Sequence, residues 1–286
     1  MQWISRAGVA LVAILALACN TSSPVDPTPT SSVSYTAIGA SDGSGFGSSV
    51  VCAPFDPDCP AGTGYVYLLK RRIQGDGRTV SLQNLAVPGS VLSPAIQTLS
   101  REIGRDILST FFDQSTVVLP GTTHLTVFAG GNDANVIAQN VRAGRAGADV
   151  RGFIDAQVNQ WQTDLQEFLR RVRQRAPNTR VVALNLPNLG AAPYVASLPV
   201  LERSILQRIA TSLTDRINAL TSQNVIVIDL MCDPRIYEPS RFSSDGFHPS
   251  DSGYALMAEL TYPALVSNSA PSPSPSCSQR TLLPVF

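Results

Sequence analysis

The sequence predicts an α/β fold, a three-layer α/β/α sandwich with a central, mostly parallel sheet of about five strands. Residues 150–172 and 201–220 carry apolar side chains at every third or fourth position, which predicts two long helices with one buried face each. Each is followed by a short apolar run, at 180–186 and 225–230, that is typical of a strand buried on both faces. Helices that alternate with such strands favour a parallel sheet covered on both sides.

The other elements continue this alternation along the chain. Short β-rich runs predict strands, and a helical repeat of apolar residues predicts helices. In chain order we expect a strand at 33–38, a glycine-rich turn at 39–47, a helix at 64–73, a strand at 79–86, a helix at 91–108 that breaks or starts near Pro94, a strand at 124–129 and a last helix after Pro249.

The two ends of the chain lack the composition of a folded domain. One positive charge and a short apolar run that ends in small residues predict a secretory signal peptide over residues 1–18. Residues 19–32 form a Ser/Thr/Pro linker, and residues 267–286 are a similar Pro/Ser-rich C-terminal tail. We therefore expect one folded domain over residues 33–266.

Cys19 is the first residue after the predicted cleavage, and it allows two interpretations of where the exported protein is located. A signal peptide, a cysteine and a polar tether resemble a bacterial lipoprotein, although Ala16 stands where leucine is usual. The alternatives are lipid attachment at Cys19, with the protein held at an outer membrane, and plain secretion. Because no later apolar stretch is long enough to span a bilayer, we expect a secreted, periplasmic or cell-surface protein.

The remaining cysteines predict disulfides, because exported proteins meet an oxidising compartment. Cys52, Cys59, Cys232 and Cys277 allow three pairings. We favour Cys52–Cys59, which would close the loop CAPFDPDC, and Cys232–Cys277, which would attach the tail to the body.

Composition excludes several classes of protein. The 286 residues include 21 basic and 21 acidic side chains, so the chain lacks the positive charge that nucleic-acid binding needs. Its two histidines, His124 and His248, and the absence of a C-x-x-C pair exclude a metal cage. We expect no metal or organic cofactor, no nucleic-acid partner and a monomer.

Polar and glycine residues follow four of the expected strands, at the sheet edge where parallel sheets place their sites. The candidates, in chain order, are Ser41, Gly89, Asn132, Asp245 and His248. A serine hydroxyl is a weak nucleophile that needs a base, usually a histidine oriented by a carboxylate. Asp245 lies three residues before His248, so that one turn can bring its carboxylate to Nδ1. The Gly89 N–H and the Asn132 amide can serve as donors to an oxyanion.

In this order the four segments resemble the SGNH (GDSL) hydrolase family, which has a flavodoxin-like fold. The resemblance implies that Ser41 is the nucleophile, that His248 is the base and that Asp245 orients His248. It also implies an oxyanion hole formed by the N–H groups of Ser41 and Gly89 and the side chain of Asn132.

One residue departs from the family pattern. Ala40 stands before the nucleophile, where the family has an aspartate. That aspartate is outside the triad, so we expect the chemistry to survive and Asp42 to replace part of its local hydrogen bonding. A different fold, the α/β-hydrolase, also has a G-x-S-x-G turn, but we reject it because only one strand precedes Ser41.

These observations predict a secreted serine esterase or lipase that works through an acyl-enzyme. Three alternatives stay open: an acyltransferase, a carbohydrate acetylesterase on the same fold and a non-catalytic glycan-binding module. Lipid, acetylated polysaccharide and small aliphatic esters all fit as substrates. We expect the loop 52–59 and the segment after Gly190 to shape the acyl pocket.

Several other polar or aromatic residues have structural interpretations. His124 starts a strand without a nearby acid and is expected to be scaffold, and Trp161 continues a helical stripe into the core. Residues 185–190 either line the cleft or form a turn. Asp133, next to Asn132, suits the N-cap of a helix.

Overall fold

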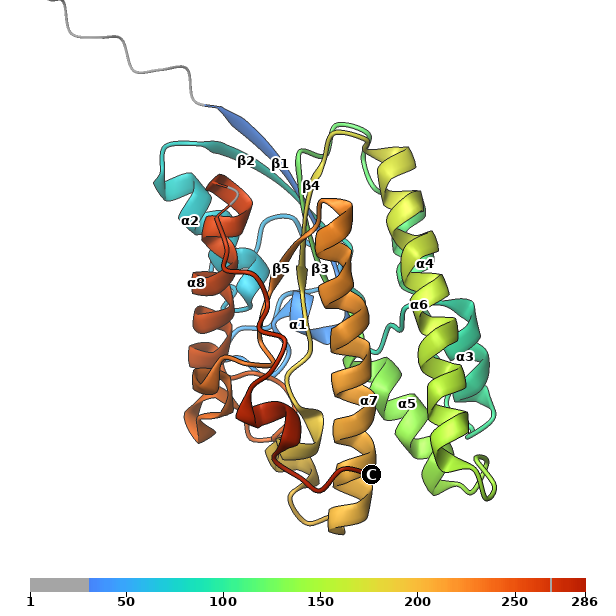
Figure 1. Ribbon diagram of the computed structural model, residues 1–286. Helices are drawn as coiled ribbons and strands as arrows, with labels where there is room; N and C mark the ends of the chain where they lie inside the picture. Colours follow the sequence, from blue (N-terminus) through green and yellow to red (C-terminus); the bar gives the residue numbers. More distant parts are fainter. Residues whose placement is uncertain (1–30, 268) are drawn as a thin grey trace, which may run out of the picture. The chain divides into compact units, whose positions relative to one another are not determined.

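The computed structural model describes residues 31–267 and 269–286, and its core is one parallel sheet (Figure 1). The sheet has five strands in the order β2-β1-β3-β4-β5. They are β1 (Ser32–Ile38), β2 (Thr79–Asn84), β3 (His124–Phe128), β4 (Arg180–Leu184) and β5 (Ile226–Ile228). All four neighbouring pairs are parallel, which confirms the predicted α/β class. The predicted signal peptide and Cys19 lie outside the described residues.

Helices cover both faces of the sheet (Figure 1). On one face, α2 (Tyr65–Gly75) and α8 (Asp251–Ser267) pack on side chains such as Tyr35 and Val182. The other face carries α3 (Pro94–Arg101), α4 (Phe111–Thr116), α5 (Gly131–Arg142), α6 (Val150–Arg175) and α7 (Val200–Asn218). Side chains of one strand alternate between these two cores, as the period of a β-strand requires.

The strand order reverses direction between β1 and β3. From β1 the chain moves to β2 on one side, then crosses to β3, β4 and β5 on the other. The connections that leave the carboxyl ends of β1 and β3 therefore diverge and leave a crevice between them, the usual place for a ligand in an open α/β sheet. Two of the predicted site segments, those of Ser41 and Asn132, begin at these two strand ends.

The predicted helix at 91–108 is wrong in extent, because one helix covers only part of that range and a second short helix begins beyond it. The first, α3, ends at Arg101, and Gly104 adopts a left-handed φ of 71° that a continuous helix does not allow. The second, α4, begins after Thr110, whose hydroxyl accepts from the N–H of Asp113 in a reciprocal capping box. The sequence pattern also missed α5 and the one-turn helix α1 (Ser41–Ser44).

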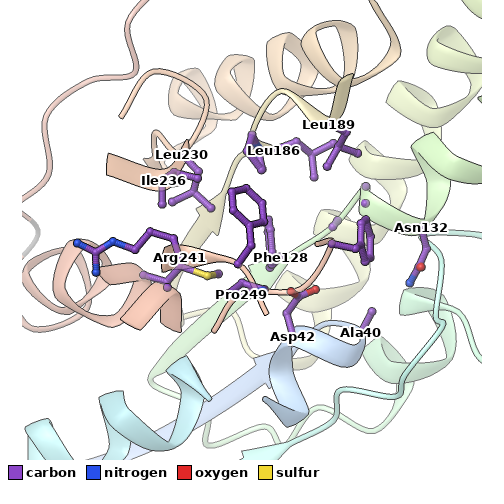
Figure 2. Close-up of a pocket in the computed structure, with 18 of the residues that line it drawn as sticks. Ala40, Asp42, Phe128, Asn132, Leu186, Leu189, Leu230, Ile236, Arg241 and Pro249 are labelled. Atoms are coloured by element: carbon purple, nitrogen blue, oxygen red, sulfur yellow. The ribbon is translucent and has the colours of Figure 1, made fainter. Parts of the chain in front are cut away.

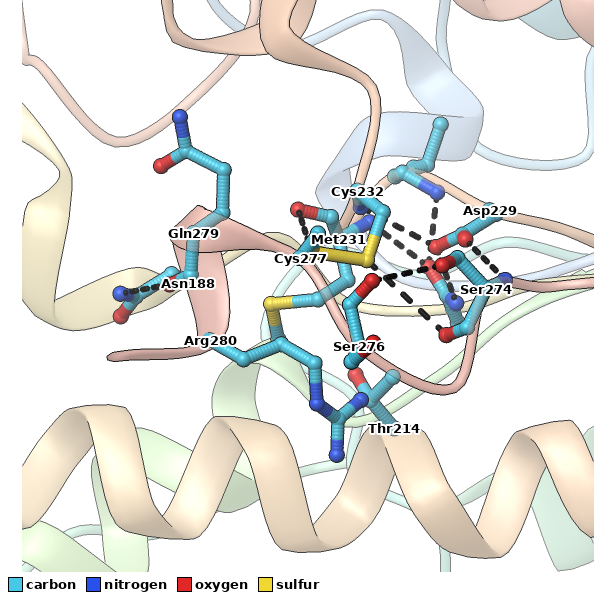
Figure 3. Close-up of a disulfide and its surroundings, with 12 residues drawn as sticks. Asn188, Thr214, Asp229, Met231, Cys232, Ser274, Ser276, Cys277, Gln279 and Arg280 are labelled. Atoms are coloured by element: carbon cyan, nitrogen blue, oxygen red, sulfur yellow. Dashed lines mark hydrogen bonds between the residues drawn. A yellow bond between two sulfur atoms is a disulfide. The ribbon is translucent and has the colours of Figure 1, made fainter. Parts of the chain in front are cut away.

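The C-terminal residues 269–286 follow α8, and around Cys277 they lie against the body of the domain (Figure 3). Disulfides join Cys232 to Cys277 and Cys52 to Cys59, the pairing that we favoured. Beside the first of them, the N–H of Ser274 donates to Asp229 at 2.8 Å. Further contacts of the segment are made by Asn188, Gln207 and Arg208, which donate to the carbonyls of Gln279, Leu283 and Phe286.

Candidate active site

Ser41 is the first residue of α1, directly beyond the carboxyl end of β1. The turn approaches the β2 side closely at Gly43, where a Cβ atom would lie 2.3 Å from the Cβ of Ala86. Asn84, at the end of β2, donates to the Gly43 carbonyl at 2.8 Å. Glycine at 43 thus lets the one-turn helix pack against the neighbouring strand end, which sets the position of Ser41 over the sheet.

His248 connects the hydroxyl of Ser41 to the carboxylate of Asp245. Its Nε2 lies 2.8 Å from Ser41 Oγ, and its Nδ1 lies 2.6 Å from Asp245 Oδ2. The segments come from opposite ends of the chain, Ser41 after β1 and Asp245 to His248 from the turn before α8. The structure therefore brings together the three residues that the sequence pattern selects, in a hydrogen-bonded serine–histidine–carboxylate chain.

Asp245 also organises the turn that carries the histidine. Its Oδ1 accepts from the hydroxyl of Ser243 at 2.8 Å, and from the N–H groups of Phe247 and His248 at 2.8 and 2.9 Å. Burial raises its pKa, but these bonds and the bond to the His248 ring outweigh burial and hold the pKa well below its usual range. Asp245 is thus kept ionised next to the imidazole.

Three potential oxyanion donors lie in the same cleft as Ser41 and His248. The cleft has a volume of about 450 Å³ and includes Gly89 and Asn132 in its lining. Asn132 donates to the Ser90 carbonyl at 3.0 Å, which orients its amide. Across residues 31–267 and 269–286, neither the N–H of Ser41 nor that of Gly89 has a hydrogen-bond acceptor. Both N–H groups are therefore free for a ligand.

Asp42 does not supply the local hydrogen bonding that we expected from it. Among the described residues no other group donates to its carboxylate. Burial raises its pKa, the nearby His248 and the backbone N–H of Asp42 itself lower it, and the charge of Asp245 raises it. Figure 2 shows the Asp42 side chain directed into an inner cavity rather than toward the backbone of the turn.

The turn before Ser41 is held instead by Gln114 of α4, a residue that sequence reasoning missed. Gln114 is 3 % exposed, accepts from the N–H of Gly39 at 3.1 Å and donates to the carbonyl of Gly39 at 2.9 Å. Its amide also lies 3.2 Å from Ser90 Oγ. One side chain therefore connects the turn that carries Ser41 to the segment that carries Gly89.

Asp133 has a different role from the predicted N-cap. It lies inside the first turn of α5, and its Oδ1 accepts from the Leu92 N–H at 2.9 Å and from Trp161 Nε1 at 3.0 Å. Burial raises the pKa of Asp133 to about 6, against the lowering effect of these bonds. Trp161 is fully buried, as predicted. Asp133 thus joins three segments beneath the cleft.

A second, inner cavity of about 70 Å³ lies behind the cleft (Figure 2). It shares Asn132 and Phe247 with the cleft, and most of its lining is apolar. Leu186 and Leu189 line it, so the segment 185–190 contributes to the site region. No residue of the loop 52–59 lines either cavity, so our expectation for that loop was wrong; its disulfide lies against Gly62 near Tyr67 of α2.

The other histidine, His124, lies at the amino end of β3, away from these strand ends. Its Nδ1 is 2.8 Å from the hydroxyl of Thr123.

Within the described ranges we find no cluster of side chains that could hold a metal ion. In that same part of the chain, no helix combines the length and apolar character of a membrane span.

Comparison with known proteins finds one matching family model and solved structures of similar fold. A model of the GDSL-like lipase/acylhydrolase family matches residues 37–256. The lipase Lip_vut3 from a goat rumen metagenome is similar in structure, with a TM-score of 0.54 and 21% identity over 79% of this chain and 94% of the lipase. TesA is similar with a TM-score of 0.50 and 15% identity over 82% of this chain and 98% of TesA. No curated protein matches the sequence significantly.

Proposed function

The chain belongs to the GDSL-like lipase/acylhydrolase family, and from this premise we propose that it is a carboxylic ester hydrolase that works through an acyl-enzyme on Ser41. One observation carries the proposal: the unbroken hydrogen-bond chain from Ser41 Oγ through His248 to Asp245, at 2.8 and 2.6 Å. These distances are within the range in which a base can take the proton of a nucleophile.

The proposed reaction has two steps. Ser41 Oγ bonds to the ester carbon while its proton moves to His248 Nε2; the C–O bond to the alcohol then breaks, and His248 returns the proton to the leaving oxygen. Water repeats the sequence on the acyl-enzyme: its oxygen bonds to the acyl carbon while His248 accepts its proton, the bond from that carbon to Ser41 Oγ breaks, and His248 returns the proton to Ser41 as the acid leaves. Asp245, bonded to Nδ1, stabilises the imidazolium that forms in each step.

The developing oxyanion would lie between the N–H groups of Ser41 and Gly89 and the amide of Asn132. The backbone donors already have fixed positions, and Asn132 is oriented by its bond to Ser90. Donors that need no rearrangement lower the barrier because they stabilise charge that exists only in the transition state.

The proposal is tested by removing the nucleophile. We expect Ser41→Ala to eliminate hydrolysis of 4-nitrophenyl acetate and labelling by a fluorophosphonate probe, with an unchanged melting temperature. Full activity of a purified Ser41→Ala variant would contradict the mechanism. Wild-type protein that folds but is never labelled would favour a non-catalytic glycan-binding module, and transfer of the acetyl group to an added alcohol or sugar would favour an acyltransferase.

We also propose that the protein acts outside the cytoplasm. The predicted signal peptide supports export, and the two disulfides are consistent with an extracellular or periplasmic location. Mass spectrometry of the mature N-terminus separates lipid-modified Cys19 from plain secretion.

A further inference from the structure

Nearly every arginine side chain in the described part of the chain has a partner. The partners are carboxylates, amide and backbone carbonyl oxygens and aromatic rings. Over residues 31–267 and 269–286, the exceptions are Arg78 and Arg105, whose guanidinium groups have no hydrogen bond, ion pair or ring contact. A guanidinium carries five donors in a rigid fork, so an unpaired one is available to a ligand.

The two exceptions lie in different parts of the molecule. Arg78 directly precedes β2, at the amino end of the sheet. Arg105 lies in the connection between α3 and α4 and lines the catalytic cleft together with Ser41, Gly89 and His248. Of the two unpaired guanidinium groups, the one that borders the proposed reaction centre is therefore Arg105.

The neighbours of Arg105 explain why it stays unpaired. Glu102, three residues earlier, pairs with Arg145 at 2.6 Å, and Asp106, the next residue, lies 4.0 Å from Arg101. Both nearby carboxylates thus face other arginines. Asp245, the acid of the cleft, is occupied by the turn and ring of His248.

The backbone of Arg105 is anchored although its side chain is free. Its N–H donates to the Ser100 carbonyl at 3.0 Å, and the buried hydroxyl of Ser100 donates to the Arg105 carbonyl at 2.8 Å. The base of the side chain is therefore held in place beside the cleft. Gln139 of α5 borders the same cleft, and in the described structure its side-chain amide has no hydrogen-bond partner either.

We propose that Arg105 binds an anionic group of the ester substrate, a phosphate or a carboxylate, with the amide of Gln139 as a second donor. The inference rests on the proposed function, because it places the anion on the same molecule whose ester is cleaved at Ser41. A planar guanidinium matches the oxygens of both anions in a two-point hydrogen bond. The zero net charge of the whole chain does not predict a preference for anionic esters, since that preference arises from the single unpaired positive charge of Arg105 at the cleft.

The test compares matched neutral and anionic esters in three proteins: wild type, Arg105→Gln and the control Arg78→Gln. One pair places the charge on the acyl side, 4-nitrophenyl butyrate against mono-4-nitrophenyl succinate. The other places it on the alcohol side, glycerol monoacetate against the acetyl ester of glycerol 3-phosphate. For at least one pair, we expect Arg105→Gln to lower kcat/KM on the anionic ester about tenfold through KM, with less than about threefold change on the neutral ester.

The control and the salt dependence sharpen the result. Arg78→Gln removes an equally unpaired charge at the far end of the sheet. We therefore expect it to leave the ratio of kcat/KM on the anionic ester to kcat/KM on the neutral ester unchanged in both pairs. The advantage of the anionic ester in wild type is expected to weaken with rising ionic strength, because the site is open to solvent. The pair that responds to Arg105→Gln identifies the side of the ester that carries the anion.

A binding measurement separates failure of this inference from failure of the proposed function. By calorimetry with inorganic phosphate, we expect binding to wild type and Arg78→Gln that is lost in Arg105→Gln. If wild type cleaves no ester but phosphate binding still depends on Arg105, the hydrolase proposal fails and the anion site stands. If esters are cleaved and Arg105→Gln keeps the wild-type anionic-to-neutral ratio in both pairs, the anion site is wrong.

Discussion

The two histidines of the chain lie at opposite ends of one sheet, in surroundings of opposite charge. At the carboxyl end, His248 lies 2.6 Å from the carboxylate of Asp245. At the amino end, His124 is partly buried near Arg180 and Arg78. Burial, as the largest cause, and the two positive charges lower the pKa of His124 to about 4. A carboxylate stabilises the imidazolium that a catalytic base must form, whereas burial and nearby cations oppose it. The same side chain therefore suits proton transfer at one end and neutral scaffold at the other.

Replacing each histidine in turn gives the largest expected difference between the two ends. We expect His248→Gln to lower kcat/KM for 4-nitrophenyl acetate by about 10³-fold or more, because the serine loses its base. His124→Gln is expected to change it by less than about threefold. Steady-state kinetics on the two variants, with circular dichroism to check folding, measures the contrast. Similar losses in both variants would show that the two ends do not differ in the way we infer.

A second, smaller contrast compares two glutamines that join segments distant in sequence. Gln114→Ala at the carboxyl end leaves the N–H and carbonyl of Gly39 without their buried partners, which costs about 1–3 kcal/mol of stability for each unpaired group. Because that turn carries Ser41, we also expect kcat to fall by about tenfold or more.

The control for this variant lies at the amino end. Gln223, just before β5, makes one side-chain bond to Gln166 at 2.8 Å, so we expect Gln223→Ala to lower the melting temperature slightly and leave kcat unchanged. Kinetics and thermal melts of both variants provide the measurement. A Gln114→Ala enzyme with normal kcat would mean that the nucleophile turn does not need this support.

The parts of the site that could be predicted are those coded by residues close together in the sequence. Asp245 and His248 share one turn, and Ser41 and Asn132 directly follow strands, so strand ends and short spacing were enough to select them. The strands and long helices were predictable for a similar reason: buried faces repeat with the period of the element.

The supports of the site could not be predicted because they connect distant segments through single polar side chains. Gln114 and Gly39 are 75 residues apart, and Asp133 and Leu92 are 41 residues apart, and no motif in the sequence marks Gln114 or Leu92 as a partner. In contrast, the short extent of the helix expected at 91–108 did have signals, Gly104 after its end and the capping pair Thr110 and Asp113 at the start of the next helix. The predicted Cys232–Cys277 disulfide fixes one point of the C-terminal segment. Several of its other contacts use backbone carbonyl groups, which every residue has, so its Pro/Ser composition carried little information about them.

The smallest expected effect concerns stability against pH, and it compares the two ends of β3. His124, which begins the strand, has a folded pKa of about 4 against an ordinary 6.5, so the unfolded chain binds more protons between these values and stability rises with pH. Asp133, which follows the strand, has a folded pKa of about 6 against an ordinary 3.8; here the folded chain binds more protons, and stability falls as pH rises through the same range.

The two contributions oppose each other between about pH 4 and pH 6, so wild-type stability is expected to change little there on their account. Removing one group leaves the contribution of the other unopposed. Relative to wild type, the free energy of unfolding of His124→Gln is expected to fall as pH rises from 4 to 6, and that of Asp133→Asn is expected to rise. Urea denaturation at pH 4, 5 and 6 measures the slopes, which remain informative even if a variant is less stable throughout. Parallel slopes in all three proteins would mean that neither end of β3 titrates as its surroundings imply, and the contrast between the two ends would then rest on the activity data alone.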